Sequence, residues 1–208
     1  MKIETINFDR NMANTYVVSH NHQAIIIDPA NSINEIEQAV GTYKVVGIIL
    51  THGHYDHFKT LPDVLNKYQV PLFMHKNAYH KLSNPEYSYS YFFGNEDGIE
   101  IDEEKVSFVK DNDTLNIGNF SIKVWLTKGH TDCSICLFID NHLFSGDTLF
   151  RGTVGRTDLE SSNTYELVES IKRLMNLKKD YLVYPGHGLH TSIEAEKRLN
   201  FFYNQIKH

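Results

Sequence analysis

The sequence predicts an α/β fold with four layers, in which two β-sheets pack together between outer layers of helices. Two observations support this prediction. Each half of the 208-residue chain contains a run of short segments with strand character, and each run is accompanied by segments with helical periodicity. No linker or low-complexity stretch divides the chain, so we expect a single domain over residues 1–208.

In the first half, strands are predicted where polar and apolar residues alternate, or where β-branched and apolar residues run together. Helices are predicted from apolar residues spaced for one helical face, and the first begins after Ser32, a favourable N-cap residue. In chain order, the predicted elements are strands at 2–8, 15–18 and 24–27, a helix at 33–40, a strand at 45–50, a helix at 61–68 and a strand at 70–75.

Residues 84–104 are rich in Tyr, Phe, Asn, Gly and acidic residues and show no clear periodicity. We interpret this stretch as a long surface loop near the functional site, because long loops in compact domains often carry function. A packed aromatic loop that only covers the core is the alternative interpretation.

The second half of the sequence has the same kinds of strand and helix patterns as the first. Its strands are again short runs of apolar and β-branched residues, and its helices again place apolar residues on one face. The predicted elements are strands at 105–109, 120–126, 134–139 and 141–144, a helix at 162–177, a strand at 181–184 and a last helix at 193–206.

Composition narrows the class of protein. The net charge of −6 argues against nucleic-acid or membrane-surface binding driven by bulk charge. Cys133 and Cys136 are too few for a disulfide framework and suit a reducing compartment. The N-terminus lacks the apolar run of a signal peptide, and the longest apolar run, residues 45–50, is too short to span a bilayer. We therefore expect a cytoplasmic protein.

The first candidate site follows the strand at 45–50, where four potential metal ligands fall within six residues: His52, His54, Asp56 and His57. In an extended backbone, His52 and His54 project to the same side and can reach one ion. After the chain turns, Asp56 and His57 can face a second ion. Imidazole and carboxylate ligands suit zinc, and also iron or manganese. The alternative, a polar turn rich in histidine, fits a single His-x-His better than this set.

Three further motifs each place a ligand residue between or beside glycines at the end of a predicted strand: Gly129-His130-Thr131, Ser145-Gly146-Asp147-Thr148 and Pro185-Gly186-His187-Gly188. Glycine allows a sharp turn there and leaves room around a metal. A lone polar residue at a strand end is usually structural, but four strand-end motifs of one kind predict a metal site. The other histidines are assigned by default to surface or core: His20, His22, His75, His80, His142, His190 and His208.

The order of these motifs resembles the metallo-β-lactamase superfamily over essentially the whole chain. The resemblance implies the αββα sandwich of that family, which agrees with the predicted elements, and a site for two Zn²⁺ per chain, with iron or manganese as other candidates. Carried over position by position, it implies His52, His54 and His130 on the first metal, Asp56, His57 and His187 on the second, and Asp147 as the bridge.

Within the superfamily, the chain resembles the short glyoxalase II-like proteins, which hydrolyse hydroxyacylglutathione, in the segments 146–150 and 155–158. Persulfide dioxygenases share these segments. Class B1 β-lactamases carry cysteine where Asp147 stands, so antibiotic hydrolysis is not expected. Full-length glyoxalase II has a C-terminal helical domain with basic residues for glutathione, and we expect those contacts to be missing. The Cys-x-x-Cys pair, Cys133 and Cys136, departs from the group and is interpreted as small core residues.

The resemblance implies a mechanism in which a water bridging two metals has its pKa lowered from 15.7 to about 7 and attacks a thioester carbonyl as hydroxide. Asp56 and Asp147 would be the catalytic carboxylates that hold and orient it. Arg156 would bind a carboxylate of the thiol half, because a planar guanidinium pairs with carboxylates in two places. The alternative for Arg156 is a surface ion pair with Asp158 or Glu160.

Two other enzymatic functions remain open, and a non-enzymatic role is disfavoured. A mononuclear-iron dioxygenase acting on persulfides would use one of His52 and His54 together with His130 and Asp147. A lactonase would use the same two-metal site for another hydrolysis. A non-enzymatic binding module has no use for seven ligand residues. The expected partner is a small thioester, with no nucleic acid and no membrane, and the sequence does not predict the oligomeric state.

Overall fold

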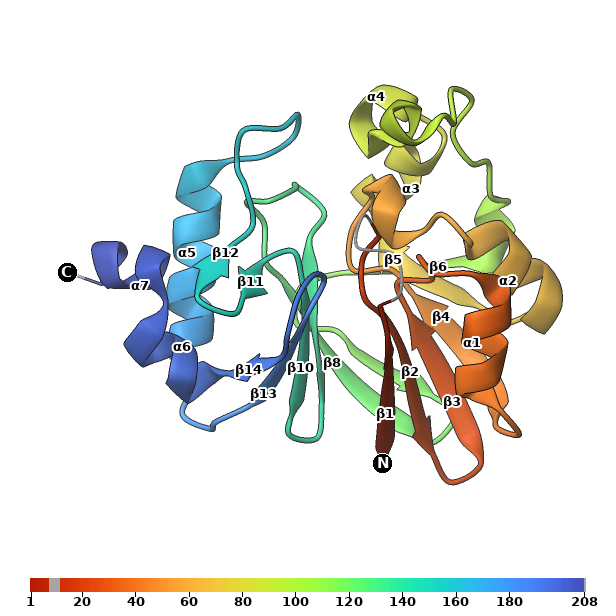
Figure 1. The fold of residues 1–208 in the computed structure, drawn as a ribbon, viewed down its shortest axis with the longest axis horizontal. Helices are drawn as coiled ribbons and strands as arrows, with labels where there is room; N and C mark the ends of the chain where they lie inside the picture. The colour runs from red at the N-terminus through yellow and green to blue at the C-terminus, as the bar shows by residue number, and fades with distance from the viewer. Residues whose placement is uncertain (8–11, 208) are drawn as a thin grey trace.

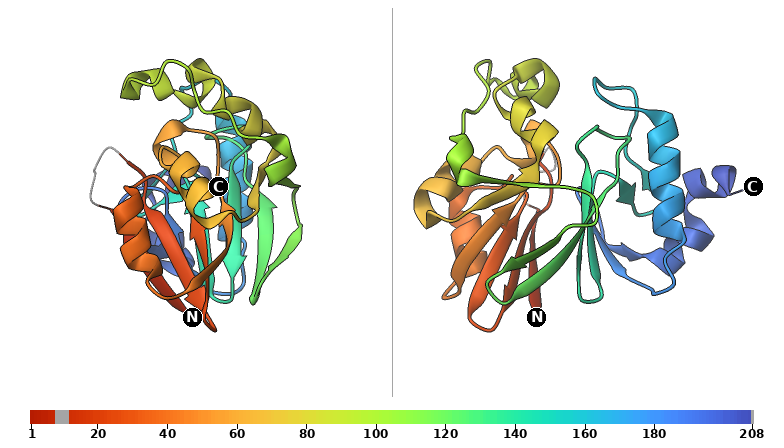
Figure 2. Two further views of the ribbon diagram at one scale, coloured as in Figure 1. Left: turned by 90° about the vertical axis from the view of Figure 1, so that its right-hand side faces the viewer. Right: turned by 180° about the vertical axis from the view of Figure 1, so that it is seen from behind.

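A computed structural model describes residues 1–7 and 12–207 of the chain. Two six-stranded sheets pack face to face in the middle of the molecule, with helices on both outer faces (Figure 1 and Figure 2). The predicted four-layer αββα architecture is therefore confirmed. The predicted helices at 33–40 and 61–68 are present with those bounds.

The first sheet runs in chain order, with antiparallel pairs up to its third strand and parallel pairs after it. Its strands are β1 (Lys2–Ile6), β2 (Thr15–His20), β3 (Gln23–Ile27), β4 (Lys44–Ile49), β5 (Leu72–His75) and β6 (Val106–Val109). Its helices are α1 (Ile33–Val40), α2 (Leu61–Tyr68) and α3 (Lys76–Leu82). Because β3 and β4 are parallel, with Ile27 opposite Ile49, Asp28 and Thr51 emerge at the same edge of the sheet.

The second sheet has the order β14-β13-β10-β9-β8-β7 and one parallel pair, β10 with β13. Its strands are β7 (Thr114–Ile117), β8 (Phe120–Leu126), β9 (Ile135–Ile139), β10 (His142–Gly146), β13 (Leu182–Pro185) and β14 (Thr191–Ser192). A small ribbon, β11 (Leu149–Phe150) with β12 (Thr153–Val154), follows β10. The pairing of Gly146 with Pro185 brings Asp147 and His187 to one edge.

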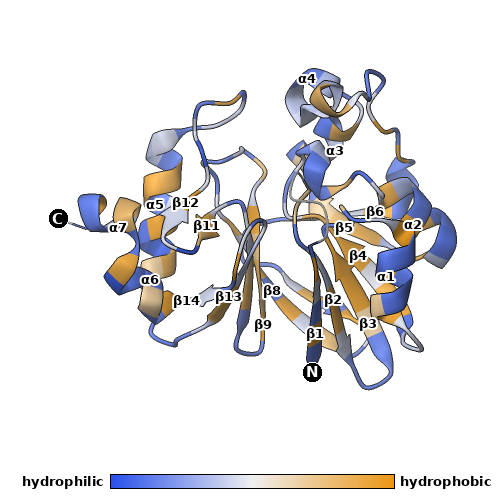
Figure 3. Cartoon of the chain, viewed as in Figure 1, coloured by the Kyte–Doolittle hydropathy of each residue, from blue (hydrophilic) through white to orange (hydrophobic). Residues whose placement is uncertain are grey.

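Apolar side chains fill the space between the sheets and the space under each helical layer. In Figure 3, orange marks the hydrophobic residues, and it covers much of the central strands. The inner core takes Val18 and Ile25 from the first sheet and Val124 and Phe144 from the second. Burial of this kind of surface contributes roughly 25 cal/mol per Å² and holds the two sheets face to face. The edges of both sheets, and hence the ligand residues, are fixed relative to each other by this packing.

The structure corrects two predictions. The single helix predicted at 193–206 is two helices, α6 (Ile193–Leu199) and α7 (Phe201–Ile206), because Asn200 adopts an extended backbone and its side chain accepts a hydrogen bond from Tyr203 N. Residues 84–104, predicted as a long surface loop, carry two short helical segments, α4 (Pro85–Ser88) and η2 (Ser90–Phe93), and the start of η3 (Glu103–Lys105). The end of the strand predicted at 2–8 falls on Phe8, outside the described residues.

Helix α5 (Thr164–Met175), with α6 and α7, covers the second sheet on its outer face (Figure 1). Across residues 1–7 and 12–207, no helix has the length and apolar character that crossing a membrane requires.

Candidate metal centre

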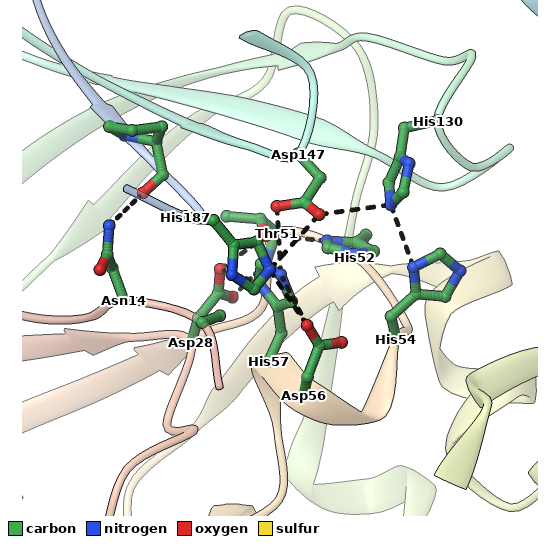
Figure 4. A network of polar contacts seen from close by, with 12 residues as sticks. Asn14, Asp28, Thr51, His52, His54, Asp56, His57, His130, Asp147 and His187 are labelled. Atoms are coloured by element: carbon green, nitrogen blue, oxygen red, sulfur yellow. Dashed lines mark hydrogen bonds and ion pairs between the residues drawn. The ribbon is translucent and has the colours of Figure 1, made fainter. Parts of the chain in front are cut away.

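All four sequence motifs meet at one edge of the two sheets, as Figure 4 shows. The first motif follows β4, and the others follow β8, β10 and β13. The structure brings the seven predicted ligand residues into three overlapping groups, in which one ligand atom per residue lies within 4.8 Å of the others. The groups are His52, His54 and His130; His52, His57 and Asp147; and Asp56, His57 and His187.

The first group consists of three buried imidazoles. Nδ1 of His54 lies 3.0 Å from Nε2 of His130. The Nε2 atoms of His52 and His54 are buried and have no hydrogen-bond partner. Burial lowers the pKa of His52 well below its ordinary value and lowers the pKa of His54 to about 3. Both rings are therefore neutral and keep a free lone pair for a metal.

The second and third groups combine imidazoles with two carboxylates. Oδ1 of Asp147 lies 3.2 Å from Nε2 of His57, and Oδ2 of Asp147 lies 3.5 Å from Nε2 of His130 and 3.6 Å from Nε2 of His187. Asp147 thus stands between the two ends of the cluster. Oδ2 of Asp56 lies 3.0 Å from Nε2 of His187. An ion at each end could share Asp147.

The charges in this half of the centre stabilise one another. Burial alone would raise the pKa of Asp147, but His57 and the neighbouring imidazoles outweigh it and hold that pKa well below its ordinary value. Burial opposes a proton on His57 and on His187, yet the surrounding carboxylates raise both pKa values. The centre therefore attracts positive charge, which a bound divalent cation would supply.

Asp28 contacts the ligand cluster directly, and the sequence interpretation missed it. Its Oδ2 lies 2.8 Å from Nδ1 of His57, and its carboxylate accepts hydrogen bonds from Thr51 N at 2.7 Å and Thr51 Oγ1 at 2.6 Å. The carboxylate orients His57 so that Nε2 faces the cluster. The available signal was position, because Asp28, like the ligand residues, directly follows a buried strand.

Two other contacts hold ligand loops in place. Nδ1 of His130 lies 3.0 Å from the backbone oxygen of Arg156, which leaves Nε2 for the cluster. Asn14, also missed from sequence, donates from its side chain to the backbone oxygens of Pro185 and Gly188, at 3.0 Å each, and its N–H donates to Gly186 O at 2.6 Å. Asn14 thereby grips the loop that carries His187.

Glycine leaves room beside the cluster, as the sequence suggested. A Cβ on Gly186 would collide with Oδ1 of Asp147 and would lie 2.6 Å from Cε1 of His57. A Cβ on Gly155 would collide with the backbone oxygen of Asp147. Among the residues described, neither His20, His22, His75, His80, His142 nor His190 joins a ligand group, and His208 lies outside them.

A cavity of about 490 Å³ opens above the cluster. His54, Asp56, His130, Asp147 and His187 form its floor, and its walls include Tyr89, Phe92, Phe93, Phe150, Val154, Arg156 and Leu159. Part of the aromatic stretch 84–104 thus borders the site, as one of the two interpretations expected. Phe92 is 71% exposed, so its ring is available to a ligand.

Arg156 borders the cavity, but its guanidinium is already paired. Nε and Nη2 donate to the two carboxylate oxygens of Asp158 at 2.7 and 2.8 Å, and both side chains are largely exposed. The hydrogen bond with Arg156 lowers the pKa of Asp158 to about 2. This is the surface ion pair that the sequence left as the alternative, located at the rim of the cavity.

Cys133 and Cys136 are both free and fully buried. Burial raises the pKa of each thiol to about 11, so both are neutral near pH 7. The prediction that they are core residues agrees with this burial.

The chain is similar to proteins described as hydrolases. The chain is 33% identical to the probable metallo-hydrolase YqgX of Bacillus subtilis over 92% of both chains. It is 32% identical to the hydroxyacylglutathione hydrolase GloC of Haemophilus influenzae over 87% of both chains.

Solved structures share the fold. BLEG-1, described as a B3 metallo-β-lactamase, matches with a TM-score of 0.89 and 27% identity over 97% of this chain and 99% of that one. TTHA1623, solved in a di-iron-bound form, matches with a TM-score of 0.80 and 25% identity over 97% of this chain and all of that one. Residues 8–187 match the Metallo-beta-lactamase superfamily, and the chain belongs to that superfamily.

Proposed function

We propose that the protein is a metal-dependent hydrolase that cleaves thioesters of the S-lactoylglutathione type with two metal ions bound per chain. Zinc is the expected metal, with iron or manganese as alternatives because the donor set mixes imidazole with carboxylate. The observation that carries the proposal is the convergence of seven imidazole and carboxylate side chains, five of which line the floor of one cavity.

The donor atoms fit such ions. Nε2 of His52 is buried, faces the cluster and has no hydrogen-bond partner, and Nε2 of His57 and Oδ1 of Asp147 lie 3.2 Å apart without forming a well-directed hydrogen bond. Buried polar atoms without partners are costly in native proteins, and here metal coordination would satisfy them. His52, His54 and His130 would hold one ion, and Asp56, His57 and His187 the other, with Asp147 shared. His57 and His130 are already oriented through Nδ1 for this task.

Two ions at these positions would supply a water of lowered pKa and polarise a carbonyl oxygen. Side chains of the protein would accept the proton and position the reacting groups. Asp56 borders the cavity, and its side chain is 21% exposed, so its carboxylate can accept a proton from that water. Asp147 is 10% exposed on its side chain and is held between three imidazoles, so its main role is to position. The aromatic walls would place apolar surface beside the reacting carbonyl.

The substrate class rests on the walls of the cavity and on the similarity to GloC. Phe92, Phe93 and Phe150 offer apolar contact to a small acyl group. Arg156 at the rim could pair with a carboxylate of the thiol half if it released Asp158. A β-lactam ring is a second candidate substrate, because the similarity to BLEG-1 covers almost the whole chain.

The test measures metal content and substrate range on one preparation of the full chain. We expect close to two ions per chain after metal supplementation, with hydrolysis of S-lactoylglutathione that is lost on chelation and restored by metal. A β-lactam, a lactone and a persulfide with oxygen monitoring complete the panel. Saturation at one iron per chain, with oxygen consumed on the persulfide, would sink the hydrolase proposal in favour of a dioxygenase.

A further inference from the structure

Lys81, in the last turn of α3, is a buried cation that the metal centre does not use. The residue is 5% exposed, and charged side chains are rarely buried to this degree without a partner. Its aliphatic stem packs on Gly53, between two of the ligand histidines, since a Cβ on Gly53 would lie 2.9 Å from Cβ of Lys81. The side chain therefore lies directly behind the His52–His54 segment.

The ammonium group of Lys81 joins segments that are far apart in the sequence. Nζ lies 3.0 Å from Oδ1 of Asp132, two residues after His130, and donates to Oγ of Ser161 at 2.9 Å. It also lies 5.2 Å from the centre of the Tyr87 ring in α4. One lysine thus touches the aromatic segment, the loop after β8 and the loop that follows Arg156.

These segments form opposite walls of the cavity above the metal centre. Tyr89, Phe92 and Phe93 line one side, and Arg156 and Leu159 line the other. A second contact between the same walls, from Glu160 N to Tyr89 OH at 2.6 Å, lies beside the Lys81–Ser161 bond. Figure 1 shows that α3 and α4 belong to one half of the sandwich, whereas the loop before α5 belongs to the other. The bond to Ser161 therefore ties the two halves together at the cavity mouth.

We propose that Lys81 is a positioning residue that fixes the spacing between the two cavity walls, and so sets substrate affinity without contacting substrate or metal. A charge-assisted bond in a buried position is stronger than a surface ion pair, which suits this role. The inference rests on the proposed function in one respect: KM can be measured only with a substrate that the protein hydrolyses. Its second measurement, the mobility of the walls, needs no substrate.

The test replaces the charge but keeps the stem, with Lys81→Met. Its matched control is Lys67→Met, which removes another helical lysine in an ion pair, 2.8 Å from Glu37 and away from the cavity. We expect Lys81→Met to raise KM about fivefold, with kcat and metal content within about twofold of the parent protein. Amide hydrogen exchange should quicken in residues 85–93 and 156–161, and should not do so in the control.

Ser161→Ala is the second variant, and it keeps the test decisive if Lys81→Met folds poorly. It removes only the contact to the opposite wall, so it should reproduce the rise in KM and the faster exchange. The double variant should have a KM close to that of Lys81→Met alone, because both changes break the same contact.

Unchanged KM and unchanged amide hydrogen exchange in Ser161→Ala would overturn the proposal. If Lys81→Met loses metal while amide hydrogen exchange in the cavity walls is unchanged, the proposal is also overturned. Lys81 would then support the His52–His54 segment and not the spacing of the walls. Absence of any hydrolysis by the parent protein would instead count against the proposed function.

Discussion

The carboxylate of Asp28 lies 2.8 Å from Nδ1 of His57 and accepts two further hydrogen bonds from Thr51. All three side chains are buried, so these bonds are shielded from water. With a metal bound, this arrangement would keep the proton of His57 on Nδ1, facing Asp28, and leave Nε2 for the metal. Carboxylates placed in this way behind a ligand histidine raise its basicity and orient its ring.

Replacement of Asp28 by Asn should weaken binding of the ion held by His57. Metal affinity at that position should fall about 10- to 100-fold, the range typical of outer-shell partners. Competition with a chromogenic chelator would measure it, with Asp63→Asn on the exposed face of α2 as the control. Unaltered affinity for both ions in Asp28→Asn would show that His57 needs no such partner.

The proposed bridging role of Asp147 separates it from His187. Asp147 lies near imidazoles at both ends of the cluster, whereas His187 lies at one end only. Loss of a charged ligand from a buried site should also cost more than loss of a neutral one. Asp147→Ala should therefore retain fewer ions and less activity than His187→Ala, as measured by elemental analysis and initial rates. Equal residual metal in the two variants would contradict the bridging assignment.

The sequence predicted the layers and the convergence of the ligand motifs because both depend on local patterns. Apolar periodicity marks buried strands, and residues that follow parallel neighbours such as β10 and β13 meet at one sheet edge. The packing of the two sheets against each other brings the residues after β4 to the same place. His52 and His187 are 135 residues apart in the chain, yet each directly follows a strand that fixes its position.

The residues that sequence reasoning missed act through long-range contacts. Asn14 donates hydrogen bonds to the loop around His187, and Lys81 donates to Ser161. Both pairs are too far apart in the sequence for a short motif to reveal them. Asp28 was recognisable only as a strand end. The break at Asn200 was hidden because the apolar pattern continues from α6 into α7. Such features depend on tertiary packing, which overrides local propensity.

The ion pair between Asp111 and Arg173 predicts a pH-dependent contribution to stability. Nη1 of Arg173 donates to Oδ1 of Asp111 at 2.8 Å, and Leu126 N donates to the same oxygen at 2.8 Å. Burial alone would raise the pKa of Asp111, but these two bonds lower it below its ordinary value of 3.8. Because the folded pKa is the lower one, the stabilisation is present above 3.8 and is lost as the pH falls through the folded pKa.

Asp111→Asn should therefore destabilise the protein near neutral pH and have little effect in acid. The pair is partly exposed, so we expect a loss of about 0.5–1 kcal/mol in the free energy of unfolding at neutral pH. Urea unfolding of metal-free protein at several pH values would measure it, and removal of metal keeps acid-induced metal loss out of the comparison. An equal loss at neutral and acid pH would mean that packing, and not charge, accounts for the effect.

The pairing of Arg156 with Asp158 leads to the last prediction, which concerns the thiol half of the substrate. If Arg156 binds a substrate carboxylate, it must first exchange Asp158 for that carboxylate, since its Nε and Nη2 are both occupied. Arg156→Ala should then raise KM for S-lactoylglutathione with kcat and metal content nearly unchanged, because an interaction common to ground and transition states is lost. Asp158→Asn should lower the same KM by about twofold to fivefold, since an exposed pair of this kind contributes only up to about 1 kcal/mol.

A thioester with an uncharged thiol half is the internal control, and neither variant should alter its KM. If both variants keep the parent KM for S-lactoylglutathione, Arg156 is only a surface charge, and the thiol half must be recognised by the aromatic wall formed by Tyr89, Phe92 and Phe93.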